Sequence, residues 1–273
     1  TSITVAPTLS AVSLKEGCYS YMFAGCEVLR EAPSLPAEKM YPSCYSYMFS
    51  GCLQIDTLPL LPSLEMAPKC YMGMFMNCKS LRETPYYRYE LPANEMAESC
   101  YAYMFYGCES LVDAPELPAE KLAERCYEYM YYGCSSIYFF SELLSFDLEK
   151  YCYASMFENC TNLQETPKII ADIMKEGCFE SMFKGCTSLE YAYLPGSELS
   201  DGCYKEMFSG CVSLNYIRVD VMTLDNDFDA TLNWVDSVDG EGVFIFPCGS
   251  TYDKHGYSEV PPNFIIKASP ILV

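Results

Sequence analysis

The sequence predicts an α/β solenoid with eight repeats of about 26 residues, each made of a strand, a loop and a short helix, and a C-terminal cap that contains β-strands. Three observations predict this fold class. The cysteines recur at a fixed spacing, the apolar residues around them follow a helical period, and each copy then continues into a Leu- and Pro-containing segment. Each element is justified in turn below.

The cysteines define the repeats. Sixteen of the 17 cysteines form pairs with seven residues between the two members, and successive pairs begin 26, 26, 30, 26, 26, 26 and 25 residues apart. This regularity over eight copies indicates internal repeats that cover about three quarters of the chain. The first cysteine of each copy, here position 0, is Cys18, Cys44, Cys70, Cys100, Cys126, Cys152, Cys178 or Cys203.

A short amphipathic helix is predicted around each cysteine pair. Position +1 is Tyr in seven copies, +4 is Met in all eight and +5 is Phe in seven. At about 100° per residue, these positions lie with 0 and +8 on one side of a helix. Position +7 is Gly in six copies and Asn in two, Asn77 and Asn159, and both types tolerate the left-handed backbone that ends many helices. The helix is therefore expected to end near +6, after roughly two turns.

A short strand is predicted at positions +10 to +14 of each copy. Position +11 is always Leu or Ile, and Pro is common at +15, where it would close the strand because it cannot donate to a ladder. One such unit has too small a core to be stable alone. Stacked units bury a continuous core, which predicts a solenoid.

The chain is expected to divide into three segments. Residues 1–17 match the strand half of a truncated first repeat, 18–218 form the solenoid and 219–273 form the C-terminal cap. We expect a further segment, with any signal or anchor region, to lie upstream of residue 1.

The cap segment departs from the repeat pattern. Val243–Phe246 and Asn263–Lys267 are predicted strands. Ala230–Val238 is a predicted helix with Asp229 as its N-cap. A cap of this kind would seal the last open repeat.

Charge and hydropathy exclude several classes of partner. The chain has 37 acidic and 17 basic residues and a formal net charge of −20, which disfavours nucleic acid and anionic lipid. No apolar run reaches about 18 residues, so no membrane-spanning segment is predicted.

The repeats resemble a known family. The segments CYSYMFSGC (44–52), CYAYMFYGC (100–108) and CFESMFKGCTSL (178–189) are similar to BspA-like leucine-rich repeats of bacterial surface proteins. The resemblance implies a leucine-rich-repeat solenoid, secretion or surface attachment, and a role in adhesion or protein binding. It implies no shared catalytic site and no ligand-contact motif. The fifth copy departs from the pattern with Ser141 in place of Pro, and the third carries a four-residue insertion.

The cysteines are predicted to be buried free thiols. Two helical turns place positions 0 and +8 about 12 Å apart, whereas a disulfide needs Cα atoms roughly 4.4–6.8 Å apart. Disulfides between adjacent repeats and metal binding remain alternatives, although metal ligands must converge and these cysteines form columns. Cys248 has no partner at repeat spacing.

Other candidate chemistry is sparse, and we predict no metal, cofactor or catalytic residue. His255, the single histidine, lies in a polar segment without a triad signature, which indicates a surface loop. Asp225, Asp227, Asp229 and Asp236 have calcium-loop spacing, but Ala230 occupies the place where the loop needs Gly.

Aromatic residues outside the repeat pattern are the candidate binding site. Tyr and Arg combine a large contact area with a polar group and are enriched in binding hot spots. One group of such aromatic residues comes from the insertion in the third copy. A second group comes from later strands, on a face that solenoids use for binding. The candidate ligand-contact patch is Tyr86, Tyr87, Arg88, Tyr89, Tyr138, Phe139 and Tyr191.

The predicted function is non-enzymatic binding or adhesion at the bacterial cell surface, with a host extracellular protein or a glycan as the partner. Two alternatives remain. The many free thiols would suit an intracellular protein-interaction scaffold in a reducing compartment. A glycan-active enzyme would need a pair of carboxylates, and no motif points to one.

Overall fold

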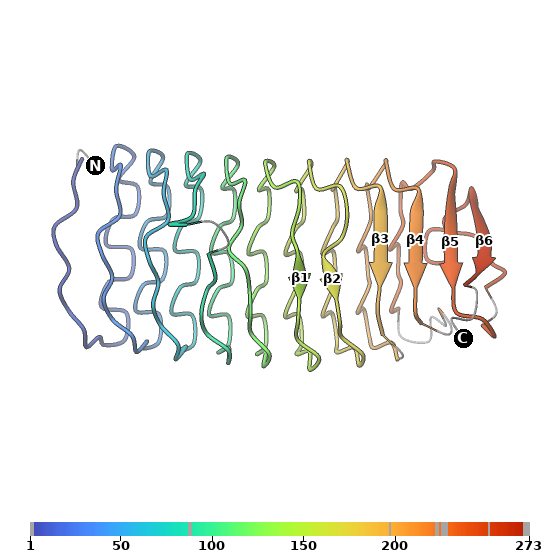
Figure 1. Cartoon of the computed structure of the whole chain (residues 1–273), viewed down its shortest axis with the longest axis horizontal. Coiled ribbons are helices and arrows are strands. Elements are labelled where there is room, and N and C mark those ends of the chain that lie inside the picture. The colour runs from blue at the N-terminus through green and yellow to red at the C-terminus, as the bar shows by residue number, and fades with distance from the viewer. Residues whose placement is uncertain are drawn as a thin grey trace.

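The protein is an elongated solenoid. The computed structural model describes residues 3–86, 89–196, 198–221, 224, 229–250 and 252–269. Successive coils lie side by side along the long axis, with the N-terminus at one end and the last strands at the other (Figure 1). Each coil has a strand side, which faces the viewer in Figure 1, and a turn side behind it.

The strand side is a parallel sheet that is most regular toward the C-terminus. A two-stranded sheet pairs β1 (Glu142–Leu143) with β2 (Lys168–Ile169). A four-stranded sheet has the order β3-β4-β5-β6, and all its pairs are parallel. Its strands are β3 (Tyr191–Leu194), β4 (Tyr216–Val219), β5 (Gly242–Phe246) and β6 (Phe264–Ala268).

Earlier repeats are connected by isolated parallel bridges such as Lys39–Glu65 and Glu90–Glu116. The predicted strand position was too early in the repeat. β3 covers positions +13 to +16 of its copy. Positions +10 to +12 belong to the segment that connects the turn side to the strand side.

The predicted short helices are wrong, because no helix forms in the described residues. Each of these segments is instead a series of tight turns with a left-handed residue at every fourth position. In the second copy these residues are Ser43, Tyr47 and Gly51, with φ of 53°, 54° and 71°. The predicted left-handed residue at +7 is correct, as at Asn77 and Asn159, but it is one of three in each copy.

The backbone hydrogen bonds explain why a helix does not form. The Tyr45 N–H donates to the Cys70 carbonyl and the Tyr47 N–H to the Met72 carbonyl, both in the next repeat, at 2.9 and 2.8 Å. The intervening Ser46 N–H donates locally, to the Ser43 carbonyl, at 3.2 Å. Every second backbone N–H of this segment thus donates to a carbonyl of the next repeat. The buried positions of each copy fit a period of four residues as well as the helical period of 3.6; they are 0, +1, +4, +5 and +8. The apolar pattern therefore could not distinguish a helix from a series of four-residue turns.

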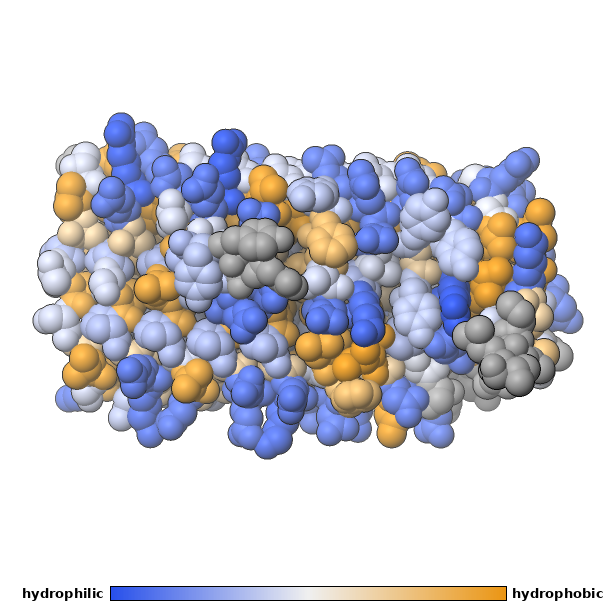
Figure 2. Space-filling model, in the orientation of Figure 1, coloured by the Kyte–Doolittle hydropathy of each residue, from blue (hydrophilic) through white to orange (hydrophobic). Residues whose placement is uncertain are grey.

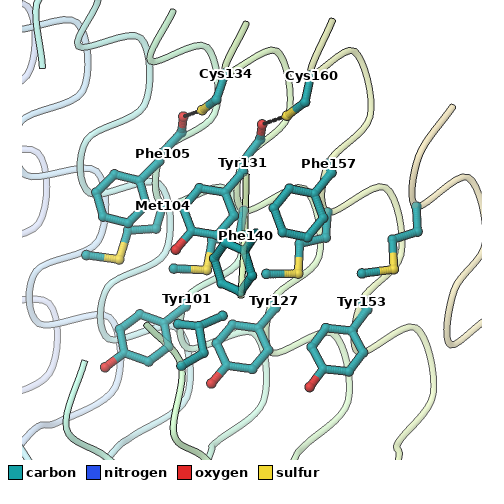
Figure 3. Packing of buried hydrophobic residues seen from close by; sticks show 14 of the residues in the cluster. Tyr101, Met104, Phe105, Tyr127, Tyr131, Cys134, Phe140, Tyr153, Phe157 and Cys160 are labelled. Atoms are coloured by element: carbon teal, nitrogen blue, oxygen red, sulfur yellow. Dashed lines mark hydrogen bonds between the residues drawn. The ribbon is translucent and has the colours of Figure 1, made fainter. Parts of the chain in front are cut away.

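The core consists of columns of identical positions. The Tyr ladder at +1 stacks at 5.6 to 5.9 Å between ring centroids, as in Tyr71–Tyr101 and Tyr101–Tyr127. The Phe ladder at +5 runs parallel to it, with Phe75–Phe105 at 5.9 Å and Phe105–Tyr131 at 5.6 Å. Figure 3 shows both ladders with methionines between them. Offset-stacked rings at these distances stabilise neighbouring repeats beyond their buried area.

The thiols are free, and 15 of the 17 are buried. At position +8 the sulfur donates back to the +5 carbonyl of the preceding repeat, as in Cys134 to Phe105 and Cys160 to Tyr131, both 3.1 Å (Figure 3). At position 0, Cys44 and Cys70 contact the sulfurs of Met40 and Met66 at 3.6 Å. Burial of these 15 free thiols confirms the sequence interpretation, whereas the repeat cysteine Cys18, predicted to be buried, is exposed.

Burial also predicts slow thiol chemistry. It raises the pKa of the Cys108 and Cys152 thiols to about 12, so little thiolate exists near neutral pH. We expect Ellman's reagent to modify the two exposed thiols, Cys18 and Cys248, within minutes, and the other 15 only after unfolding. The unfolded, unreduced protein is the control and should yield all 17 thiols. A lower yield from that control would indicate disulfides instead.

The C-terminal segment continues the coil. Residues 230–238 form no helix, and left-handed Asp229, Asn233 and Ser237 repeat the four-residue turn pattern. Trp234, fully buried, stands where other copies have Met, and its Nε1–H donates to the Glu259 carbonyl at 2.7 Å. Asp229 is therefore not a helix N-cap. The two predicted cap strands are confirmed as β5 and β6. The division at residues 17 and 218 stays a prediction.

Candidate functional site

A pocket on the strand side is the candidate site. It measures about 390 Å³ and is formed by three consecutive repeats. The third contributes Thr84 and Tyr89, the fourth the segment 112–116, and the fifth the segment 138–141. Its lining is Thr84, Tyr89, Val112, Asp113, Ala114, Glu116, Tyr138, Phe139, Phe140 and Ser141.

Tyr138 and Phe139 form the exposed rim of this pocket. Their side chains are 55% and 50% exposed. The next residue, Phe140, turns inward and packs on Phe157 and Tyr131, at 5.1 and 5.8 Å between ring centroids (Figure 3). The inward anchor at Phe140 thus holds the two preceding aromatic rings at the surface.

The described residues of the insertion in the third copy differ in exposure. Tyr86 is 57% exposed and contacts Tyr89 edge to face at 5.2 Å. Tyr89 is only 3% exposed, and its hydroxyl accepts a hydrogen bond from the Leu61 N–H at 2.8 Å. Tyr89 is therefore part of the pocket floor, not the exposed contact residue that the sequence suggested. Tyr87 and Arg88 lie outside the described residues.

Tyr191 lies apart from this pocket. It is 51% exposed at the start of β3 and packs on Tyr216 with 6.0 Å between ring centroids. Its repeat is two beyond that of Tyr138, which corresponds to roughly 10 Å along the axis at the spacing of adjacent strands. The structure thus brings Tyr138 and Phe139 together with Tyr89 in one pocket and places Tyr86 against Tyr89, whereas Tyr191 lies outside the lining of this pocket.

The pocket is acidic. Asp113 is exposed, Glu116 is half-buried, and neither Lys, Arg nor His is among the described lining residues. Elsewhere, lysines pair with glutamates of the neighbouring repeat, as in Lys79–Glu109 at 2.7 Å and Lys150–Glu176 at 2.6 Å. Figure 2 shows this side of the molecule as a mixture of hydrophilic and hydrophobic residues without one continuous apolar surface.

A second aromatic group on the turn side was missed by the sequence interpretation. Tyr103 stacks on Tyr129 at 5.0 Å and Tyr106 on Tyr132 at 4.4 Å, and all four rings are partly exposed. Burial, followed by the Glu128 charge, raises the pKa of Tyr103 to about 12. The sequence signal for this aromatic group was the presence of Tyr at both +3 and +6 in two successive copies, the fourth and the fifth. It was overlooked because a helical wheel assigns those positions only to a generic polar face.

The remaining candidates carry no site. His255 is exposed, as predicted, and its Nδ1 lies 3.0 Å from the Pro261 carbonyl. Asp225 and Asp227 of the calcium-like spacing lie outside the described residues. Within the described ranges, no group of three or more His, Cys, Asp and Glu side chains is arranged to hold a metal ion.

Comparison with protein families decides the identity of the repeats. Residues 9–138, 75–167 and 99–228 match the BspA type leucine-rich repeat region, which is described as six copies. The chain belongs to the BspA-type leucine-rich-repeat family. This membership supports a repeat-based binding protein, and leucine-rich-repeat proteins are generally not enzymes. No helix in the part of the chain that the structure describes is long and apolar enough to cross a lipid bilayer.

Two solved structures share some likeness with this BspA-type chain. A leucine-rich cell surface protein from Faecalibacterium prausnitzii A2-165 is 14% identical, over 93% of this chain and 76% of that one, with a TM-score of 0.36. A leucine-rich-repeat protein from Bacteroides ovatus ATCC 8483 is 15% identical, over 97% and 83%, with a TM-score of 0.30. At these scores neither structure bears on the function of this chain. No curated protein matches it significantly.

Proposed function

We propose that this BspA-type chain is a non-enzymatic binding protein of the cell surface that recognises a host protein or a glycan through its strand side. The observation that carries the proposal is the exposed pair Tyr138 and Phe139 at the rim of a pocket of about 390 Å³, with exposed Tyr86 in contact with Tyr89 of its lining. Family membership supports binding by the repeats and, by resemblance, a surface location.

The exposed aromatic rings favour a contact role over a packing role. Core aromatic residues of this chain lie in ladders and are almost fully buried, whereas these three rings are each at least half exposed. Large exposed aromatic side chains around a pocket are typical of binding hot spots, because they bury much area for little loss of conformational freedom. Tyr87, Arg88 and Tyr191 remain part of the proposed contact region. Tyr89 supports it from beneath.

The location is tested by surface shaving. Intact producing cells are treated with a protease, and the released peptides are identified by mass spectrometry. Release of repeat peptides without lysis supports the surface location. The buried free thiols also suit a reducing compartment, so retention until lysis would favour the intracellular scaffold.

The contact role is tested by a double substitution, Tyr138→Ser with Phe139→Ser. Against a panel of extracellular matrix proteins and glycans, we expect the variant to lose at least about tenfold in affinity, since hot-spot truncations commonly cost more than 1 kcal/mol each. Its melting temperature should stay unchanged because both side chains are half exposed.

The matched control is Tyr41→Ser with Phe146→Ser, which removes two exposed aromatic rings elsewhere. Equal binding by both variants would contradict the proposed site. Hydrolysis of any glycan in the panel would contradict the non-enzymatic role.

A further inference from the structure

Four sulfur atoms of the third and fourth copies form a cluster. The Cys70 thiol lies 3.6 Å from the Met66 sulfur, and the Cys100 thiol lies 3.6 Å from the Met96 sulfur. Both pairs occupy positions −4 and 0 of their copies. The sulfur cluster therefore combines one thioether and one thiol from each of two adjacent repeats.

The backbone holds the two pairs next to each other. Glu65 and Glu95, which precede the two methionines, form a parallel bridge, and the Tyr71 N–H donates to the Cys100 carbonyl at 3.0 Å. Coils joined in this way are about 4.8 Å apart, as the strands of a sheet are. With metal–sulfur bonds of about 2.3 Å, two ligands of one ion lie at most about 4.6 Å apart. Each pair thus already has a suitable spacing, and the flexible methionine side chains can close the remaining gap between the pairs.

A pocket gives access to the sulfur cluster. Met66 and Met96 are partly exposed and line a pocket of about 510 Å³. The other methionines at position −4 also contact a cysteine, but they are buried. They are Met40 and Met174, with exposures of 4% and 3%. An ion from solvent can therefore reach the methionines of the sulfur cluster without opening the core.

The donor atoms select a soft ion. Thiolate and thioether sulfurs favour Cu(I), whereas Mg²⁺, Ca²⁺ and Mn²⁺ are bound by oxygen ligands. Protein zinc sites use thiolate, imidazole and carboxylate ligands, so a donor set that is half thioether favours Cu(I) over zinc. The sulfur cluster is distinct from the groupings of His, Cys, Asp and Glu considered above, because two of its four donors are methionines.

From this arrangement we propose that the sulfur cluster binds one Cu(I) ion. The inference does not rest on the proposed contact role of Tyr138 and Phe139, which line a different pocket. One thiol gives its proton to solvent as its sulfur forms a bond to Cu(I), and the copper keeps its oxidation state. The ion and the single thiolate together carry no net charge, which suits a site where an unpaired charge would be costly.

The protonation of the thiols gives the reaction a second signature. Burial raises the pKa of the Cys100 thiol to about 12 and that of the Cys70 thiol well above its ordinary value. Both thiols are therefore protonated at neutral pH. Each Cu(I) ion that binds should release one proton, which a pH indicator in weakly buffered solution measures.

An anaerobic titration with Cu(I), in competition with the coloured chelator bicinchoninate, tests the site. The parent protein carries Cys18→Ser and Cys248→Ser, which remove the two exposed thiols. The test variant adds Met66→Leu and Met96→Leu to this parent. These changes conserve side-chain volume, which protein cores tolerate well, and a circular dichroism melt of each variant checks that it is folded.

The matched control adds Met40→Leu and Met174→Leu to the same parent. These two methionines contact the thiols of Cys44 and Cys178 at 3.6 and 3.9 Å but lie outside the lining of the pocket. We expect the parent and the control to withhold one equivalent of Cu(I) per chain from the chelator. The test variant should bind Cu(I) at least about tenfold more weakly, since loss of a group that only supports a metal ligand already costs about 10–100-fold.

Three outcomes would overturn the inference. A parent protein that withholds no Cu(I) would show that the sulfur contacts serve packing alone. Equal affinity of the test and control variants would place any bound ion at other sulfurs. Binding without release of a proton would exclude a thiolate ligand.

Discussion

The folded protein is expected to unfold cooperatively as the pH rises from about 9 toward 11, because its buried thiols resist ionisation. Burial raises the pKa of the Cys100, Cys108, Cys152 and Cys211 thiols from the ordinary value of 9.0 to about 12. The unfolded chain releases these protons above about pH 9, whereas the folded chain retains them. The stabilisation is therefore complete below pH 9 and is lost as the pH rises toward 12.

The magnitude of this effect is large. Each such thiol lowers the free energy of unfolding by about 1.4 kcal/mol per pH unit between its two pKa values, so these four alone remove about 5 kcal/mol per unit. A typical domain is stable by about 5–15 kcal/mol. Burial also raises the pKa of further thiols, such as Cys70, Cys126 and Cys178, which steepens the loss.

Circular dichroism during a titration from pH 7 to pH 12, with a reductant present, measures this transition. Return to pH 7 should restore the spectrum and so separate unfolding from chemical damage. Replacement of one buried thiol, Cys108→Ala, should reduce the slope of stability against pH by about 1.4 kcal/mol per unit. An unchanged spectrum up to pH 11 would contradict the effect of burial on these thiols.

The second large effect is expected for Phe157→Ala in the middle of the solenoid. Phe157 is fully buried and stacks between Tyr131 and Phe183, at 5.5 and 5.7 Å between ring centroids. It also contacts the ring of Phe140 in a T-shaped arrangement, at 5.1 Å between ring centroids. Removal of a buried Phe typically costs about 3–5 kcal/mol, through lost burial and the cavity that remains.

Urea unfolding followed by circular dichroism measures the loss. Phe139→Ala is the matched control, since that ring is half exposed and its removal should change stability by less than about 1 kcal/mol. Because each repeat contacts only its neighbours, the weakened repeat should also broaden the transition as the two flanking parts unfold separately. A loss below about 1 kcal/mol for Phe157→Ala would show that the ladder relaxes around the gap.

The sequence was sufficient for the solenoid and most of the core, whereas the C-terminal segment, which was predicted to be a cap with a helix, continues the coil instead. Cysteine spacing and the Met and Phe positions identify the buried columns, because a repeat places the same side chain in the same environment in every coil. The local backbone could not be predicted in the same way. A helix and a series of four-residue turns bury the same positions. The hydrogen bonds that distinguish them join residues about 26 positions apart, beyond the reach of local propensity.

The candidate site was predicted in part. Tyr138 and Phe139 depart from the repeat pattern, and such departures indicated surface residues correctly. Tyr89 departs from it too but is buried, and its hydroxyl accepts a hydrogen bond from the Leu61 N–H. Burial of an inserted residue depends on the path of the insertion, and no periodicity describes that path. The acidic lining at Asp113 became visible only when three repeats were placed side by side.

The direction of the hydrogen bonds on the turn side also bears on how such a chain can change in length. Between positions −1 and +7, every second backbone N–H of a repeat donates to a carbonyl of the following repeat. The carbonyls of the same segment accept the equivalent hydrogen bonds from the preceding repeat. Whole repeats can therefore be duplicated or deleted without leaving these backbone groups unpaired, whereas one extra residue within a turn segment would shift the later donors of that segment out of line with their acceptors. The four-residue insertion of this chain lies on the strand side, where isolated bridges at Thr57–Glu83 and Glu90–Glu116 flank it. In this chain the extra residues thus fall outside the turn segments, so a new contact surface can arise there while the turn side keeps the coils in register.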